Sequence, residues 1–254
     1  MLEKILVGDL FTVLMIFSRI GSGLMIMPGF AEVYVSFRAR LLLALSFSVV
    51  LAPIMQPYMP SLPNSPLVLT YMLGGEIIIG IAIGTVCRML VASLHVAGMI
   101  YSAQSGLSMA TQFDMTQSTQ GTLMGNLLSM TGVVFLFTSD LHYTMLRGMV
   151  DSYNLFSPGI APPINDFAQY FSMLVGKIFL VGVKLSAPAI VVGLLLYLGV
   201  GILARLMPQM QVFYIIQSPQ VLLGIFLLMA MFTSILLEFA DFFRTDFALF
   251  LGNV

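Results

Sequence analysis

The chain has 254 residues, of which 59% are hydrophobic and only 8% are charged, against about 25% charged in a soluble domain. A surface of this composition cannot all be hidden from water in a compact soluble fold, so the sequence predicts a membrane-type protein. Ten Lys and Arg against eleven Asp and Glu leave no basic face for nucleic acid, and the single cysteine, Cys87, excludes an internal disulfide.

Long runs of apolar residues predict the helices. The first, 10–27, is interrupted by Arg19 and is followed by no small-residue cleavage site, so we expect it to remain in the mature protein rather than to be a signal peptide. The later runs are 41–75, 67–87 around Glu76, 89–113, 115–139, 185–204 and 206–237. Each is long enough to span hydrocarbon as a helix. We therefore expect an all-α, integral membrane-type protein of six or so long hydrophobic helices.

Prolines, glycines and polar residues mark the breaks between these helices. Five prolines in the 53–66 stretch exclude helix there. Further breaks are predicted at 112–121, 157–163 and 207–211. The Lys and Arg bias of the connecting segments is too weak to orient the helices, which suggests that they do not all cross the bilayer in the usual way. Neither an internal repeat nor a pair of matching broken helices supports a carrier fold.

Charged residues inside or at the edge of apolar helices are candidates for intramembrane or interhelical charges. They are Arg19, Glu76, Arg88, Lys177 and Lys184. A charge that faces lipid costs from about 3 kcal/mol upward, so we expect these side chains to face protein or water. Interhelical pairing, within the chain or with a partner subunit, is the preferred interpretation. A proton or ion relay is the alternative.

Small residues recur at every fourth position in several helices, a spacing that lets helix backbones approach closely. The three series are Gly80 and Gly84, then Gly98, Ser102 and Gly106, then Gly121, Gly125 and Ser129. We expect Gly80, Gly84, Gly98 and Gly125 to be helix-packing positions.

The segment 106–121 is polar, yet it bears Met and Phe and joins two apolar helices. At membrane depth its backbone would have to be buried in protein or to line an aqueous cavity, as a pore-lining loop does. An ordinary exposed connector explains its composition equally well.

Catalytic and metal-binding patterns are weak. Ser108 with His142 is the one serine–histidine candidate for an intramembrane hydrolase, but no second glycine opens an oxyanion site beside Ser108. His95 and His142 lack the carboxylate spacing of a metal site, and no Gly-rich phosphate loop is present. The sequence thus predicts no enzyme, no metal and no cofactor.

A series of short motifs follows a recognisable order along nearly the whole chain. They are Arg19 with Gly21, Pro28-Gly29-Phe30, Arg38-Ala39-Arg40, Glu76 with Gly80 and Gly84, Gly98, Gln104-Ser105-Gly106, Asp114, Leu141-His142, Ser152 to Gly159, Pro188, Leu198-Gly199, Arg205 to Phe213 and Gly224. In this order and spacing they resemble the FliR family of flagellar biosynthesis proteins. Injectisome counterparts belong to the same superfamily of type III secretion export-gate subunits. His142 and the Ser157-Pro158-Gly159 stretch fit the flagellar branch better.

The resemblance implies that residues 1–254 form a single export-gate subunit in the bacterial inner membrane, at the flagellar basal body. It implies a hetero-oligomer with the flagellar export-gate proteins P and Q, next to export protein B and membrane lipid. In that assembly helical hairpins pack into a closed ring around a channel through which unfolded flagellar proteins pass. The alternatives are an injectisome gate subunit or, in a different class, a small-solute membrane transporter.

The resemblance also implies that the 106–121 loop, from Gly106 to Gly121, is a plug that blocks the channel. Within it we expect Met109, Phe113 and Met115 to be the apolar plug residues. Bulky, flexible side chains can seal a pore without trapping a charge and can yield to a passing chain. Asp114 would fix the loop by accepting nearby backbone hydrogen bonds.

Overall fold

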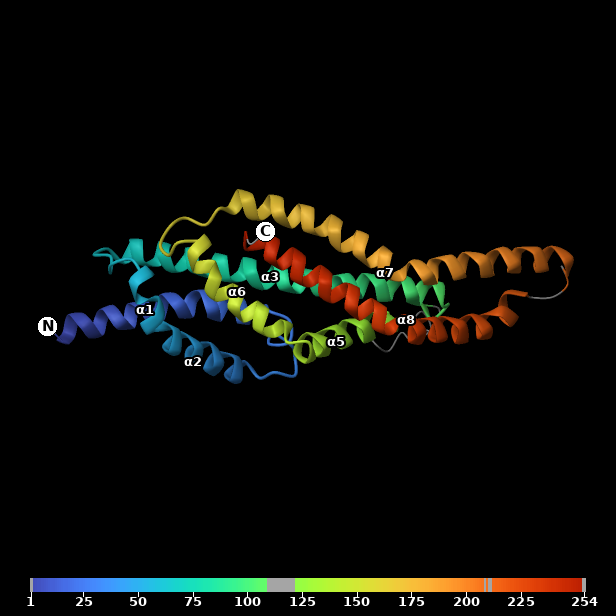
Figure 1. Cartoon of the computed structure of the whole chain (residues 1–254), viewed down its shortest axis with the longest axis horizontal. Coiled ribbons are helices and arrows are strands. Elements are labelled where there is room, and N and C mark those ends of the chain that lie inside the picture. Colours follow the sequence, from blue (N-terminus) through green and yellow to red (C-terminus); the bar gives the residue numbers. More distant parts are fainter. Residues whose placement is uncertain (1, 109–121, 208, 210–211, 253–254) are drawn as a thin grey trace. The chain divides into compact units, whose positions relative to one another are not determined.

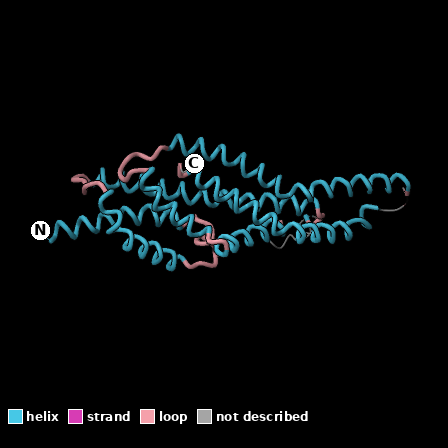
Figure 2. The backbone as a smooth tube through the Cα atoms, in the orientation of Figure 1, coloured by secondary structure: helices cyan, strands magenta, loops and turns pink. Residues whose placement is uncertain are grey.

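The computed structural model describes residues 2–108, 122–207, 209 and 212–252. Throughout these ranges the chain is helical with connecting loops, and no strand occurs in them (Figures 1 and 2). The predicted all-α class is confirmed. Five of the predicted plug residues lie outside the described ranges, namely Met109, Phe113, Asp114, Met115 and Gly121.

The chain divides into two compact units, each described here by itself. Unit 1 comprises Met1–Met89, Ser139–Met173 and Arg244–Val254, and unit 2 comprises Leu90–Thr138 and Leu174–Phe243. Three long helices contribute residues to both units: α3 (Pro66–Gln104), α7 (Ile164–Leu206) and α8 (Val212–Phe250).

Unit 1 begins with a hairpin of two helices, α1 (Leu2–Leu24) and α2 (Phe37–Met55). The Ser36 hydroxyl caps α2 by accepting a hydrogen bond from the backbone N–H of Ala39 (3.3 Å), as N-cap side chains do. In the 3₁₀ turn η1 (Gln56–Tyr58), Gln56 donates to the Asp9 carboxylate (2.9 Å). The end of α2 therefore returns to the start of α1.

The prediction that 53–66 contains no helix is wrong at both ends. Pro53 lies near the end of α2, and Pro66 is the first residue of α3. A proline is tolerated at the first position of a helix because its missing N–H would have no partner in that helix. Between them, residues 59–65 form no helix, as predicted.

Close backbone contact joins α1 to α3 within unit 1. A side chain added at Gly84 would lie 2.7 Å from the backbone oxygen of Gly23, and one at Gly80 would collide with the backbone oxygen of Arg19. Only glycine permits this approach, so α1 and α3 lie against each other at Gly80 and Gly84. The helix α6 (Leu141–Leu155) completes this part of the unit, with the Met149 side chain packed against Gly23.

Unit 2 contains two antiparallel helix pairs. The second half of α3 packs on α5 (Leu123–Thr138), where an added Cβ at Gly98 would lie 2.5 Å from Cα of Gly125. The α7 and α8 segments of this unit form a hairpin. In it Lys184 pairs with Glu238 (3.7 Å), and Gln220 donates to the Tyr197 hydroxyl (3.2 Å).

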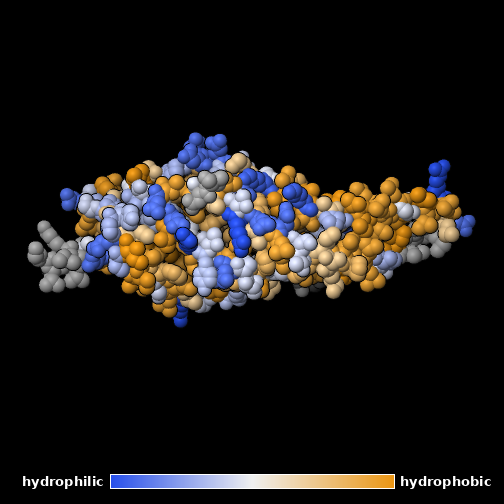
Figure 3. Space-filling model, in the orientation of Figure 1, coloured by the Kyte–Doolittle hydropathy of each residue, from blue (hydrophilic) through white to orange (hydrophobic). Residues whose placement is uncertain are grey.

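Four described helices are long and apolar enough to cross a membrane, or five if α5 and α6 count as one broken span. This supports the predicted membrane-type class. In the most apolar windows of α7 and α8 only 17% and 22% of the residues are buried. Figure 3 shows mostly hydrophobic residues at the right-hand end of the view, where Figure 1 draws the later part of α7 and the early part of α8. Their side chains must be covered by something other than this chain, whether lipid or protein.

Candidate functional site

Two of the predicted intramembrane charges meet inside unit 1. Nε of Arg19 on α1 donates to one carboxylate oxygen of Glu76 on α3 at 2.6 Å, and Nη2 donates to the other at 3.1 Å. The side chains are 0% and 1% exposed. The two-bond geometry matches a planar guanidinium to a carboxylate, the arrangement in which such pairs are strongest.

The remaining contacts of Arg19 come from α6 and from the loop that follows it. Nη1 donates to the Ser152 hydroxyl (3.2 Å), and Nη2 donates to the backbone oxygen of Phe156 (2.9 Å). The guanidinium carbon lies 3.9 Å from the centre of the Tyr153 ring, a cation–π contact that becomes stronger away from water. The buried cation is thus surrounded by a carboxylate, two neutral acceptors and an aromatic face.

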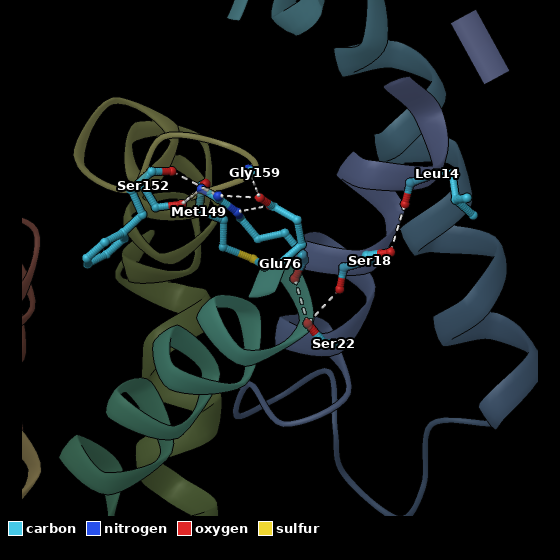
Figure 4. A network of polar contacts seen from close by, with 9 residues as sticks. Leu14, Ser18, Ser22, Glu76, Met149, Ser152 and Gly159 are labelled. Carbon is cyan, nitrogen blue, oxygen red and sulfur yellow. Dashed lines mark hydrogen bonds and ion pairs between the residues drawn. The ribbon is translucent and has the colours of Figure 1, made fainter. Parts of the chain in front are cut away.

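Glu76 also bonds to the loop between α6 and α7. Its carboxylate accepts a hydrogen bond from the backbone N–H of Gly159 (3.4 Å), a residue in the left-handed region at φ 82°. Figure 4 shows Glu76, Ser152 and Gly159 converging at this point, with Ser152 also donating to Met149. The network therefore ties together α1, α3, α6 and the loop. Because both carboxylate oxygens are engaged and water is excluded, the geometry favours a structural role over a proton relay.

The other three predicted charges lie apart from this network. Arg88 is exposed, with Nη1 3.5 Å from the backbone oxygen of Ile26, and Lys177 is partly exposed. Lys184 pairs with Glu238 in unit 2, where the side chains are 66% and 56% exposed. A charged pair on the outside of two apolar helices is unfavourable in lipid, which indicates protein or water beside it.

A second polar cluster, in unit 2, holds the start of the 106–121 segment. Here α3 ends at Gln104, and Gly106 takes a left-handed conformation (φ 71°), which is typical of the residue that ends a helix. Nε2 of Gln220 on α8 donates to the backbone oxygen of Gln104 (2.7 Å). The Gln220 side chain, 7% exposed, thus satisfies a carbonyl that the end of the helix leaves without a partner.

Two glycines make room for this cluster. Gly193 on α7 lies against the Gln104 side chain, and Gly224 on α8 lies against Ser105. A side chain at either position would displace the end of α3. The described part of the chain therefore fixes where the 106–121 segment begins, at Gly106.

No prediction from the sequence gives a role to Gln220, Ser152 or Tyr153. The signal that could identify Gln220 is an amide inside the long apolar run 206–237. Ser152 and Tyr153 begin the motif from Ser152 to Gly159, but their contacts with Arg19 follow only from the packing of α6 beside α1.

The weak catalytic and metal candidates gain no support. The His142 ring packs on Tyr143, with the two ring centroids 4.1 Å apart. Nδ1 of His95 lies 3.2 Å from the Ser129 hydroxyl, which gives that histidine a structural hydrogen bond. Within the described ranges no group of three His, Cys, Asp or Glu side chains could hold a metal ion.

Comparison with known proteins finds a family that matches most of the chain. A family model described as bacterial export proteins, family 1, matches residues 10–245. The chain belongs to this family. The match includes both polar clusters, from Arg19 of the first to Gln220 of the second.

Curated members named flagellar biosynthetic protein FliR are similar to this bacterial export protein. The one from Caulobacter vibrioides is 33% identical over 237 residues, 91% of this chain and 92% of the relative. The one from Aquifex aeolicus is 28% identical over 95% of this chain and 93% of the relative. The one from Bacillus subtilis is 28% identical over 55% of each. The resemblance to the FliR family is confirmed.

Proposed function

We propose that this bacterial export protein is a subunit of the flagellar type III protein export gate. With partner proteins it would form the channel through which unfolded flagellar proteins cross the bacterial inner membrane. The observation that carries the proposal is the family match over residues 10–245, together with 33% identity to a flagellar biosynthetic protein over nearly the full length of both. In this role the chain is structural and not an enzyme.

The proposed partners are the flagellar export-gate proteins P and Q, with export protein B beside them. Two features of the chain support protein neighbours. The long helices α7 and α8 bury little of their apolar surface within the chain, and the Lys184–Glu238 pair lies on that open surface. Lipid could cover the apolar side chains, but it would be a poor neighbour for two charges.

The composition of the native particle tests the proposal. The chain is purified in mild detergent from its own host, and the mass and subunits of the particle are determined. Recovery together with the two partner gate proteins is expected. Recovery as a lone chain or a homo-oligomer would contradict the proposal. A gradient-driven uptake assay on the lone chain in liposomes would then test the alternative function, transport of a small solute across the membrane.

The segment 106–121 is the proposed plug of the channel. It begins at a fixed point, because Gln220 and the left-handed Gly106 end α3 there. A segment held at its base can close a pore when its remaining side chains fill the opening, and Met109, Phe113 and Met115 have the size and flexibility for this.

Deleting residues 110–119 should raise ion leakage across membranes that contain the gate, while the particle still assembles. Leakage is measured with and without the deletion at equal amounts of intact complex. Unchanged conductance in an intact complex would refute the plug and leave the gate assignment standing, since that rests on particle composition.

A further inference from the structure

An aromatic pocket lies in unit 1 beside the loop between α6 and α7. Its volume is about 550 Å³, within the range of about 300–1,000 Å³ that is typical of ligand pockets. Four rings line it: Phe156, Phe167, Tyr170 and Phe250. They form one connected cluster, with centroids 5.2 Å apart for Phe156 and Phe167 and 5.1 Å apart for Tyr170 and Phe250. The pocket is thus lined by aromatic rings that also contact one another.

One carboxylate lines this pocket. Asp166, in the first turn of α7, is the charged residue among the described lining residues. It is exposed, and among the described residues its side chain has neither an ion pair nor a hydrogen bond. The Tyr170 hydroxyl is already engaged, since it donates to the backbone oxygen of Asp246 (2.7 Å). The pocket therefore offers one unpaired negative charge beside several aromatic rings.

This combination favours a cation. Ring faces attract cations, and a nearby carboxylate adds a full opposite charge. A guanidinium fits both, because it stacks flat on rings and bonds a carboxylate through two N–H groups. Apolar side chains at the rim, Leu155 (48% exposed) and Ile160 (65% exposed), could contact an aliphatic stem or the neighbouring residues of the same segment.

We propose that this pocket binds an arginine side chain of a partner polypeptide, with the guanidinium on Asp166 and its stem among the rings. The inference rests on the proposed function in that the partner is sought within the export gate. A lipid amine is the competing cation, but a phospholipid carries its amine next to a phosphate. That phosphate would bring a negative charge close to Asp166, whereas an arginine brings none.

Photocrosslinking in the purified complex tests the proposal. A benzophenone amino acid replaces Ile160 at the rim, and the crosslinked product is identified by mass spectrometry. We expect one partner segment, crosslinked next to an arginine. Asp166→Asn should lower the yield of that product about tenfold, the fold-change that corresponds to about 1.4 kcal/mol, because the pair would lose one of its two charges. Asp166→Arg should abolish the crosslinked product. Changing the partner's arginine to aspartate in the same complex should restore it.

The matched control is Asp241→Asn, which removes the same charge from another exposed position that does not line the pocket. It should leave the yield unchanged. The proposal is overturned if the adduct is a phospholipid, if the partner segment carries no arginine, if no product forms in an intact complex, or if Asp166→Asn has no effect. If the complex is intact but the product is absent, only the proposal that the pocket binds a partner arginine is refuted. If the chain purifies without partners, both that proposal and the proposed function are refuted.

Discussion

At residue 19, a positive charge is completely excluded from solvent and is balanced by Glu76 at 2.6 Å. Removing the partner leaves that charge buried and uncompensated, which costs about 3–5 kcal/mol. We therefore expect Glu76→Gln to lower the thermal stability and the recovery of the complex strongly. The double variant Arg19→Met with Glu76→Leu should be less harmful, because it removes both charges and keeps apolar volume. Thermal melting of the purified particle measures both.

The control for that substitution is a surface ion pair of unit 1. Arg147 lies 3.5 Å from Asp151 and its side chain is 83% exposed, so Arg147→Gln should change stability by no more than about 1 kcal/mol. Equal melting temperatures for Glu76→Gln and Arg147→Gln would show that the buried pair contributes little.

A single methyl group at Gly98 is the second test at this scale. The added Cβ would lie 2.5 Å from the Gly125 backbone, so α3 and α5 would have to move apart. Overpacking of this kind costs about 1–3 kcal/mol. The matched control is Gly176→Ala on α7, where an added Cβ meets nothing within 4 Å and alanine favours helix. Melting temperatures should fall for Gly98→Ala and hold or rise for Gly176→Ala; the reverse order would contradict the close packing.

At the scale of elements, composition predicted the helical class and most of the breaks, but not the ends of the helices. The charge-free run 185–204 predicts one helix, yet α7 starts at Ile164 and passes through both Lys177 and Lys184. A charge does not end a helix when its side chain can reach protein or water. Likewise, Arg19 and Glu76 were each expected to face protein, but 57 residues separate them. Only the packing of three helices identifies them as partners.

The contact of α8 with the end of α3 gives a prediction about the plug. Gln220→Leu removes the donor to the Gln104 carbonyl and leaves that part-buried acceptor without this partner, at a cost of about 1–3 kcal/mol. The start of the 106–121 segment would then be less firmly placed, so ion leakage through the assembled gate should rise. Gln217→Leu is the control, since that amide lies three positions earlier on α8 and forms no hydrogen bond with Gln104 in the described part of the chain. Equal leakage in the two variants would contradict the prediction that Gln220 holds the start of the 106–121 segment in place.

At the scale of the whole molecule, the chain leaves large apolar areas that it does not cover itself. Leu222, Phe226 and Met229 on α8 are 71%, 70% and 74% exposed, and their spacing places them on one face of the helix. Composition alone predicted a membrane protein, but it could not distinguish a face that meets lipid from one that meets another subunit. The two differ in packing, since lipid adapts to a larger side chain and a close-packed protein interface does not.

Replacing Leu222 with tryptophan separates these two environments. Tryptophan is well tolerated beside lipid near the membrane surface, whereas in a packed interface the extra volume costs about 1–3 kcal/mol. If partner subunits cover this face of α8, Leu222→Trp should reduce recovery of the complex roughly tenfold, the equivalent of about 1.4 kcal/mol, while the amount of chain in the membrane fraction stays constant. Quantitative immunoblots of membranes and of purified particles give the two values. Full recovery of the complex would mean that lipid covers this face, and the partner interfaces would then have to lie on other helices.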